Sequence, residues 1–552
     1  MIPIRSISSA ALLAIALSIS AAAQQTRADA EKDPILKAML TELDRNKASL
    51  KLEGFEKPFF IEYRIEDATT FDTRSEFGAS EGSQNGHQRV ARVAVRVGDY
   101  KTDSSTPRGD GAAEMTTLDD DPIALRSALW IATDEAYKAA LAAYAQKQAA
   151  LKQVQTPPQF DDFSKETPLI SLAAPAVLGL SEQARTEWTE RVAHDSGLYR
   201  SAAKDTQVQY SVASFEARAV TTWLVNSEGT IVRKSTTGFE ETFGTGTQAA
   251  DGMRIDRSYA STGAALKDVD SSEAFAKHAV GLIASLADLR SAPLVEEEYH
   301  GPILLSADSS ADVMYSLVAP GLAATRPRLG TEARTNGVFA SSYHARILPD
   351  FLDAVDDPGL KSFNGQNLLG AYDADDEGVA AKAVPVVTAG KLENYLIGRE
   401  PVRDFPQSNG HARAALSGPA RPTASVLKIT AQNGLSDAEL EKKLIDMAKD
   451  RGLTSVYYAE TMGPAMTPRK LYRVSLDGKR ELVRGAVIAD LDQRALRSGI
   501  EAAGHDLWVT NYFGAGAQVS HTVLAPALLF SDVTVKRANE KNNKLPYYPP
   551  PD

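Results

Sequence analysis

The chain has 552 residues, a formal net charge of −12 and no cysteine. An acidic chain without clusters of lysine and arginine is poorly suited to bind nucleic acid, and the lack of cysteine excludes disulfides, thiolate metal ligands and cysteine nucleophiles. The length is enough for roughly two to four domains, each with its own hydrophobic core.

The N-terminal residues 1–23 have the features of a secretory signal peptide. Arg5 is their only charged residue, a mostly apolar run covers 10–19, and three alanines precede Gln24. This run is too short to span a bilayer as a stable helix; the alternative is a buried N-terminal helix. We therefore predict a periplasmic or secreted protein without an integral membrane segment.

Residues 24–295 are predicted to alternate between helices and strands, which indicates a mixed α/β domain. In the strand expected at 89–97, Arg92 and Arg96 share one face, and we interpret that face as solvated rather than as an anion site. The expected elements are a helix over 33–52, strands over 59–65 and 89–97 with a Gly/Ser/Asn-rich connection at 78–86, a long helix from 121 to about 154 with Trp130 on its apolar stripe, a helix over 181–194, strands from 208 with a hairpin turn at 226–229, and a helix over 271–290.

Residues 296–540 are predicted to be richer in strands, and a proline-rich tail follows at 541–552. The pattern predicts an α+β fold of two domains. The expected elements are a strand over 302–305 and the helix after it, a weak strand over 346–355, a hairpin over 384–397 with its turn at Ala389-Gly390, a helix over 437–449, strands over 455–459, 472–475 and 481–488, a helix near Asp490, and strands over 508–512 and 525–533.

The stretch 301–330 places a short strand before a helix, which is a common position for an active site. Asp308 or Ser309 is the expected N-cap, and Pro320 is expected to end or kink the helix. The helix offers Tyr315 and Ser316, but no histidine, cysteine or carboxylate follows Asp312 before residue 331. The apolar residues at helical spacing are Val313, Met314, Leu317 and Val318.

Motifs for other chemistry are weak. The eight histidines never lie at helical spacing, so a zinc pair on one helix is excluded, whereas a site assembled from distant histidines stays open. One GxSxG match, around Ser80, lacks the strand–turn–helix context of a nucleophile elbow. The acidic run at 373–377 resembles the start of a calcium loop, but Val384 stands where the loop needs its glutamate, so we interpret the run as an acidic turn.

The order of segments in the second half resembles the TldD/PmbA family, also called the gyrase-modulator family of metallopeptidases. The resemblance implies the family's two-domain α+β architecture, with an antiparallel, barrel-like C-terminal domain. The segments that carry it are GPILLSADSSADVMYSLVAPGL at 301–322, DADDEGVAAKAVPVVTAGKLENYLIGRE at 373–400, SNGHARAA at 408–415, DGKRELVRGAVIADL at 477–491 and APALLFSDVTV at 525–535.

In the catalytic members that this chain resembles, the two histidines of HExxxH bind zinc, and the glutamate acts as general base on the metal-bound water. A cysteine near the C-terminus is the third zinc ligand. The resemblance places Tyr315 and Pro320 at the histidines, Ser316 at the glutamate, and Tyr512 or Phe513 near the cysteine. These residue types do not replace the lost zinc ligands and base. We therefore expect no catalytic residues and no cofactor at this degenerate motif.

The family also has a non-catalytic branch, TldE or PmbA, which pairs with a TldD-like subunit. By this resemblance we predict a non-catalytic subunit or a peptide-binding partner of a zinc metallopeptidase, in a heterodimer or a homodimer, acting on unfolded peptide. The residues proposed for peptide binding are Ser408, Asn409, His411 and Arg413.

Two alternatives stay open. One is an active metallopeptidase that binds zinc through a different set, such as His300, His344 and His411. The other is a peptide- or envelope-binding protein without a role in proteolysis. Whether the chain is an enzyme is therefore undecided by the sequence.

Overall fold

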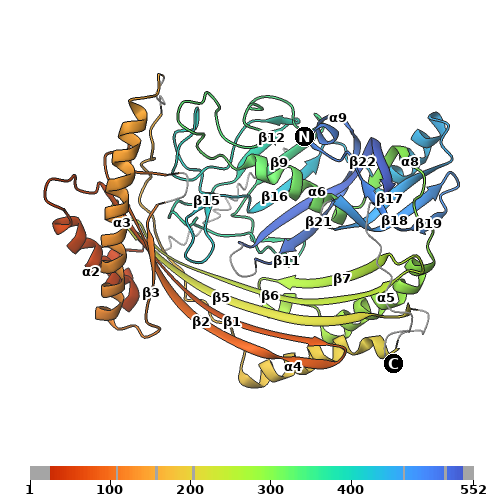
Figure 1. Ribbon diagram of the computed structural model, residues 1–552, viewed down its shortest axis with the longest axis horizontal. Coiled ribbons are helices and arrows are strands. Elements are labelled where there is room, and N and C mark those ends of the chain that lie inside the picture. The colour runs from red at the N-terminus through yellow and green to blue at the C-terminus, as the bar shows by residue number, and fades with distance from the viewer. Residues whose placement is uncertain are drawn as a thin grey trace, which may run out of the picture.

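The computed structural model describes residues 25–106, 110–155, 160–201, 206–463, 466–514 and 519–538. Two large β-sheets dominate the described residues, one strongly curved and built from the N-terminal half, the other built from the C-terminal half and lying over it (Figure 1). The predicted signal peptide and proline-rich tail lie outside the described residues. The α+β fold class is confirmed.

The first sheet has seven strands, in the order β3-β2-β1-β5-β6-β4, with β7 also paired to β6. Its long strands reach 18 residues and pair antiparallel, and burial alternates with period two along much of β5 and part of β6. The strands are β1 (Phe60–Glu76), β2 (Ala79–Arg96), β3 (Ala112–Met115), β4 (Ile170–Leu172), β5 (Tyr210–Asn226), β6 (Ile231–Gln248) and β7 (Arg254–Gly263).

Helices cover one face of this sheet. The odd-numbered residues of β1, such as Tyr63 and Ile65, point into a core with α2 and α3, and Phe215 of β5 points into a second core with α4 and α5. The helical segments are α1 (Arg27–Ala30), α2 (Pro34–Ser49), α3 (Pro122–Leu151), α4 (Glu182–Ser196), α5 (Ser272–Ser291) and the 3₁₀ turns Leu198–Ser201 and Leu266–Asp268.

Two predictions for this half are wrong in detail. All but the first residue of the connection expected at 78–86 belong to β2, and their polar side chains lie on an exposed edge strand. Trp130, expected on the apolar stripe of α3, is 54% exposed, whereas Tyr137 of the same helix is buried. Within the described residues, no helix combines the length and the apolar character that crossing a membrane requires.

The second sheet has eleven strands, in the order β13-β12-β9-β16-β22-β8-β17-β18-β19, with β20 and β21 also paired to β22. It is open and mixed rather than barrel-like and antiparallel, because β16 with β22 and β8 with β17 pair in parallel. Its strands are β8 (Tyr299–Leu305), β9 (Leu352–Asp356), β12 (Val384–Thr388), β13 (Lys391–Leu392), β16 (Val426–Ala431), β17 (Ser455–Gly463), β18 (Thr467–Ser475), β19 (Arg480–Val483), β20 (Ala486–Ile488), β21 (Ile500–Tyr512) and β22 (His521–Arg537).

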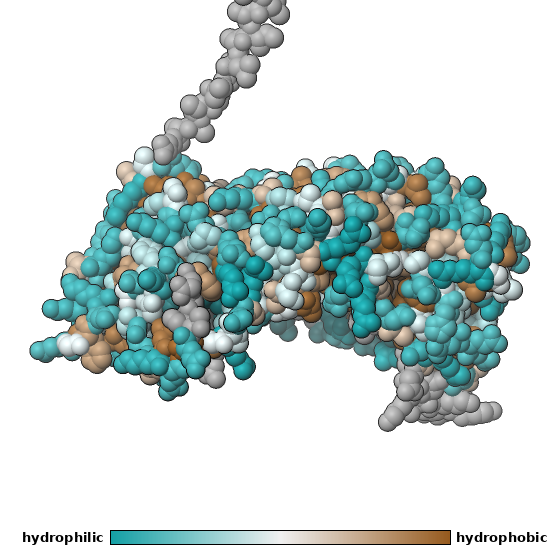
Figure 2. All heavy atoms as spheres, turned by 90° about the horizontal axis from the view of Figure 1, so that it is seen from above, coloured by the Kyte–Doolittle hydropathy of each residue, from teal (hydrophilic) through white to brown (hydrophobic). Residues whose placement is uncertain are grey.

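Helices and short hairpins complete this half. Helix α6 packs on one face of the second sheet, and α8 packs on the other. The remaining elements are α6 (Ala307–Leu317), α7 (Ala319–Leu322), α8 (Asp437–Asp450), α9 (Gln493–Ser498) and the two-residue strands β10 (Ser362–Phe363), β11 (Gln366–Asn367), β14 (Ala412–Arg413) and β15 (Arg421–Pro422). Viewed from above, the outer surface is largely hydrophilic, with scattered apolar patches (Figure 2).

The face of the first sheet that the helices leave open carries charged residues, and the second half covers it. Arg96 is buried beside Asp103 and Asp110, and Arg92 donates a hydrogen bond to the Ser417 carbonyl oxygen at 3.1 Å. The interpretation of Arg92 and Arg96 as a solvated face is therefore wrong. Periodicity identified the polar face of the strand correctly, but it does not show that another part of the chain covers that face.

Candidate functional site

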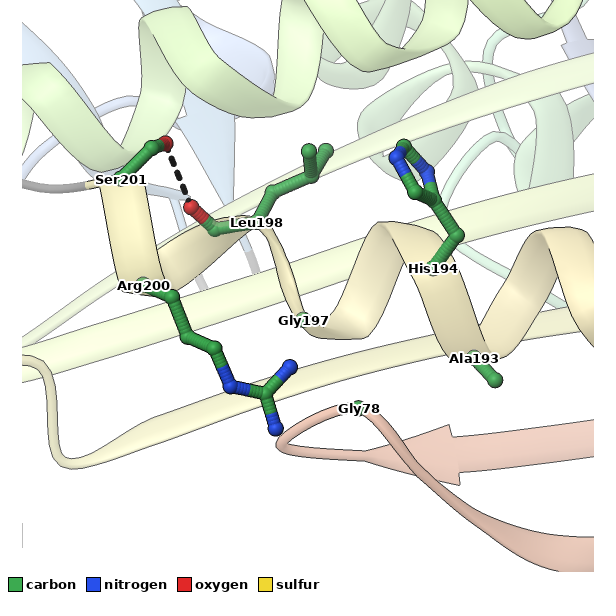
Figure 3. A pocket seen from close by; sticks show the side chains of 7 residues that line it. All are labelled: Gly78, Ala193, His194, Gly197, Leu198, Arg200 and Ser201. Atoms are coloured by element: carbon green, nitrogen blue, oxygen red, sulfur yellow. Dashed lines mark hydrogen bonds between the residues drawn. The ribbon is translucent and has the colours of Figure 1, made fainter.

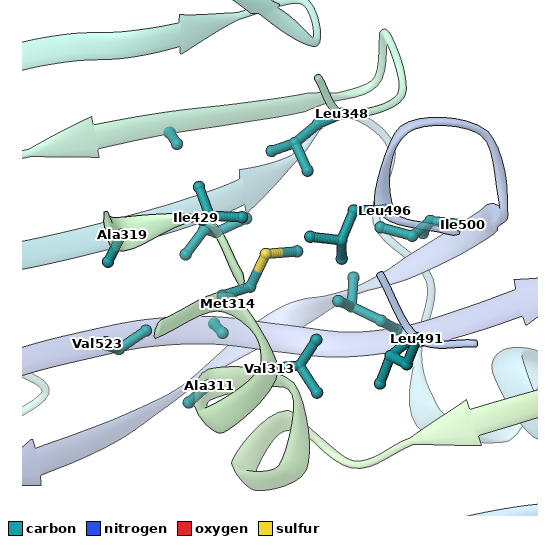
Figure 4. Close-up of a cluster of buried hydrophobic side chains, with 14 of the residues drawn as sticks. Ala311, Val313, Met314, Ala319, Leu348, Ile429, Leu491, Leu496, Ile500 and Val523 are labelled. Atoms are coloured by element: carbon teal, nitrogen blue, oxygen red, sulfur yellow. The ribbon is translucent and has the colours of Figure 1, made fainter. Parts of the chain in front are cut away.

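Helix α6 is held on the second sheet by its first turn and its apolar face. Ser306 is the N-cap, in place of the expected Asp308 or Ser309; its hydroxyl accepts a hydrogen bond from Ser309 N and donates one to the Glu460 carbonyl oxygen. Val313 and Met314 are buried in the main core, as predicted (Figure 4). The helix ends at Leu317, three residues before Pro320.

Tyr315 of α6 forms an aromatic stack with Tyr512 of β21 and His521 of β22. The Tyr315 ring lies 3.8 Å from the His521 ring and 5.2 Å from the Tyr512 ring, centroid to centroid, and all three are nearly parallel. Tyr315 and Tyr512 are the residues that the resemblance placed at a zinc-binding histidine and near the cysteine, and the fold brings them together. Ser316 and Pro320 are exposed.

Two carboxylates of α6 lie beside this stack. The Tyr512 hydroxyl donates a hydrogen bond to Asp312 Oδ1 at 2.7 Å. Burial raises the pKa of Asp312, and this hydrogen bond opposes the rise. Burial, together with the charge of Asp312, raises the pKa of Asp308 to about 6.

His521 is neutral at physiological pH, because burial lowers its pKa to about 4. Its Nδ1 lies 3.3 Å from the Val519 carbonyl oxygen, whereas its buried Nε2 has no hydrogen-bond partner in the described part of the chain. Sequence reasoning missed this residue, because an isolated histidine at the start of a strand carries no motif.

The donors around the stack do not fit a zinc ion. His521 contributes one imidazole, and the side chains of Tyr315, Ser316 and Pro320 supply neither an imidazole nor a carboxylate. His300, His344 and His411 are not brought together either: among the described residues, no three histidine or acidic side chains are grouped so as to hold a metal.

A small cleft lies between the sheets next to this stack. The intersheet cleft encloses about 70 Å³ and is bordered by Phe513 and Ser520, the chain neighbours of Tyr512 and His521. Its remaining lining residues are Glu66, Arg218, Val220, Thr222, Lys234, Thr236, Thr237, Gly238, Leu369, Asp376, Arg413, Ala414, Leu416, Gly514 and Val519.

The predicted acidic turn forms the charged wall of this cleft. Asp376 is buried and pairs with Lys234 of β6 and with Arg413 Nε at 3.4 Å, and it accepts a hydrogen bond from Ala414 N at 2.7 Å. These cations hold the pKa of Asp376 well below its usual range despite the burial. The neighbouring Asp375 accepts backbone hydrogen bonds that close the turn.

Of the four residues proposed for peptide binding, Arg413 lines the cleft. Ser408 is buried and donates its hydroxyl hydrogen to the Ile397 carbonyl oxygen, and the Asn409 amide bridges Ile397 N and the Tyr395 carbonyl oxygen. His411 is fully buried, with Nε2 3.1 Å from Asp356 Oδ1. The assignment of these residues to peptide binding stays a prediction.

A larger hollow of about 320 Å³ lies at the far end of the first sheet, beside the turn between β1 and β2 (Figure 3). The Arg200 guanidinium reaches toward this turn and donates to the Phe77 carbonyl oxygen at 2.9 Å. His194, on its rim, has a largely exposed side chain. These groups are not arranged around a shared point, so the intersheet cleft is the better candidate site.

Comparisons with known proteins agree with the resemblance. Residues 298–537 match the family described as the PmbA/TldA metallopeptidase C-terminal domain. No curated protein matches the chain.

Three crystal structures share the fold. A proposed DNA gyrase modulator from Thermotoga maritima is 16% identical with a TM-score of 0.60, and TldE from Thermococcus kodakarensis is 14% identical with a TM-score of 0.59; each alignment covers 90% of this chain and 100% of the other. A proposed DNA gyrase modulator from Bacteroides thetaiotaomicron is 13% identical with a TM-score of 0.57, covering 91% of this chain and 98% of the other.

Proposed function

This chain belongs to the TldD/PmbA family, and we propose that it is a subunit without zinc-peptidase activity of its own, which supports a catalytic relative or holds peptide for it. We also propose that residues 1–23 direct its export, so that the chain and its catalytic relative act in the periplasm or outside the cell.

The stacking of Tyr315 on His521 and Tyr512 carries the proposal. In the resemblance these tyrosines stand at zinc-ligand positions, and in the fold their rings pack against each other. Neutral phenols with pKa values raised by burial are poor zinc ligands. The resemblance places Ser316 at the position of the glutamate, and its exposed hydroxyl group is a poor general base compared with a carboxylate.

The proposal is tested by zinc analysis and peptide cleavage with the purified chain, alone and mixed with a relative that has HExxxH intact. We expect no stoichiometric zinc and no cleavage by the chain alone, and a higher cleavage rate in the mixture than with the relative alone. Stoichiometric zinc together with cleavage by the isolated chain would overturn the proposal.

A matched positive control restores the motif. The variant Tyr315→His, Ser316→Glu, Pro320→His, Tyr512→Cys supplies the four missing groups at the positions that the resemblance indicates. If this variant binds zinc and the parent chain does not, the parent chain lacks only the zinc-ligating side chains. If the relative's cleavage rate is unchanged by the parent chain, the partner role is wrong.

A further inference from the structure

The intersheet cleft has an excess of positive charge. Arg218, Lys234 and Arg413 line it, against two carboxylates, Glu66 and Asp376. Arg218 Nη1 donates a hydrogen bond to the Gly514 carbonyl oxygen at 3.0 Å. Both carboxylates are already engaged. Asp376 pairs with Lys234 and Arg413. Glu66 lies 3.5 Å from the Arg64 guanidinium and accepts a hydrogen bond from Ser417 N at 2.9 Å.

Arg413 presents free donors to this cleft. Its side chain is 9% exposed, one face lies 4.5 Å from the Tyr372 ring, and Nε points at Asp376 Oδ2. Its two terminal nitrogens donate no hydrogen bond to any residue that the structure describes. Because a guanidinium presents those nitrogens as a planar fork, an anion such as a carboxylate fits them through two parallel hydrogen bonds.

The remaining lining residues indicate which part of a ligand would lie beside that carboxylate. Thr222, Thr236 and Ser520 are polar residues of this lining, whereas the Thr237 hydroxyl donates to the Ala264 carbonyl oxygen at 2.6 Å. Apolar side chains form the rest of the lining: Val220, Leu369, Leu416, Phe513 and Val519. A volume of about 70 Å³ holds about five water molecules, so the cleft accommodates the end of a chain rather than a whole peptide.

Gly238 of β6 allows the Phe513 ring to approach closely at one side of the cleft. A Cβ atom at this position would lie 2.6 Å from the Phe513 ring, so the absence of a side chain lets Phe513 pack directly on β6. This contact holds β6, which carries Lys234, against the part of the second half that carries Phe513.

We propose that the intersheet cleft binds the free C-terminal carboxylate of a peptide whose last side chain is apolar, with Arg413 and Arg218 as its main anchors. The inference rests on the proposed function in that the ligand is a peptide, and it adds which end of the peptide is recognised. It requires neither zinc nor a catalytic partner.

Binding is measured by isothermal titration calorimetry with the full chain and four probes. The probes are N-acetyl-Ala-Ala-Leu with a free carboxylate, the same tripeptide as its amide, N-acetyl-Ala-Glu-Leu amide, and inorganic phosphate. We expect the free carboxylate to bind at least about ten-fold more tightly than the others. The amide lacks the charge, phosphate lacks an apolar side chain to contact the apolar lining, and the internal glutamate carries its carboxylate away from the end of the chain. Equal binding of the amide, of the internal glutamate or of phosphate overturns the proposal.

Two variants locate the site. Arg413→Gln and Arg218→Gln are each expected to weaken binding of the free tripeptide by about ten-fold or more. Arg254→Gln removes an exposed arginine of β7 that pairs with Asp256 and is the matched control, with unchanged binding. Thermal unfolding checks that each variant is folded. Arg218 lies at the rim and is less buried than Arg413, so its variant keeps the test valid if Arg413→Gln does not fold.

Unchanged affinity in both folded variants overturns the proposal. These results are separate from those for the proposed function. A chain that fails to bind the tripeptide but raises cleavage by a catalytic relative keeps its supporting role and loses only this ligand.

Discussion

The carboxylate of Asp376 and the ammonium of Lys234 form an ion pair between the acidic turn of the C-terminal half and β6 of the first sheet. Both groups are largely buried, and Arg413 shares the carboxylate. A buried ion pair offsets the loss of hydration only when both partners are present. This contact therefore couples the packing of the two sheets to the charge of the cleft between them.

Replacing Asp376 by Asn is expected to destabilise the chain by about 3–5 kcal/mol, because Lys234 and Arg413 would stay buried without their counter-charge. The effect is measured as the free energy of unfolding in urea at pH 7. Asp373→Asn is the control from the same turn. Its side chain is 71% exposed and pairs with an exposed Lys361, so it should cost at most about 1 kcal/mol. If both variants lower the free energy of unfolding equally, the buried ion pair stabilises the fold no more than the exposed one.

Glu240 gives the chain a pH-dependent stability. It lies directly opposite Glu216 on the face of the first sheet toward the second half, with Asp72 beyond Glu216 in the same row, and Thr262 donates to it at 3.0 Å. Burial, with a smaller contribution from Glu216, raises its pKa to about 7. A carboxyl group with a raised pKa in the folded state stabilises the fold below its unfolded pKa, near 4.5, and this contribution is lost as pH rises to about 7.

Glu240→Gln should therefore raise the free energy of unfolding at pH 8 by about 1–2 kcal/mol and change it little at pH 4. Urea unfolding at several pH values measures the difference. Glu81→Gln, at a more exposed carboxylate paired with Arg74, should leave the pH profile unchanged. A variant profile parallel to that of the parent chain would contradict the raised pKa.

The hairpin between β12 and β13 depends on Gly390. Its φ is +73°, and a Cβ atom would lie 2.2 Å from the Leu348 carbonyl oxygen. Gly390→Ala should cost more than the roughly 1–2 kcal/mol of a left-handed alanine, because the backbone must also shift. Gly365→Ala, at φ +83° with nothing within 4 Å, isolates the conformational cost alone. Similar losses in urea unfolding for both variants would exclude the steric contribution.

Local elements were predictable from the sequence wherever one face of the element is buried. The helix of α6 and the turn at Ala389-Gly390 follow from apolar spacing and turn residues, and both are present. The long strands β1 and β2 were underestimated, because the outer part of β2 is a polar edge strand without an apolar face.

The site was less predictable, because its groups come from distant parts of the chain. Lys234 and Asp376 are 142 positions apart, and neither has a motif that indicates the other. Arg92 and Arg96 of β2 carry the alternation of a solvated face, and only the structure shows that Arg96 is buried and that Arg92 contacts the second half. The resemblance did bring Tyr315 and Tyr512 to one place, because it carries three-dimensional information that periodicity lacks.

The hydrogen bond from Tyr512 to Asp312 provides a direct test of the stack beside the cleft. Tyr512→Phe keeps the ring but removes the donor, so it should cost about 1.5–3 kcal/mol at neutral pH, the range for hydrogen bonds to charged groups. It should also move the pKa of Asp312 further upward, because the phenol opposes the effect of burial. Urea unfolding and NMR titration of the Asp312 carboxyl carbon measure the two effects.

Tyr315→Phe is the matched control for this change. The Tyr315 ring stacks on the same partners, and its hydroxyl makes no hydrogen bond to a residue that the structure describes. It should therefore lose little stability and leave the Asp312 titration where it was. If Tyr512→Phe behaves like Tyr315→Phe in both measurements, the stack is held by ring packing alone, and Asp312 does not depend on Tyr512.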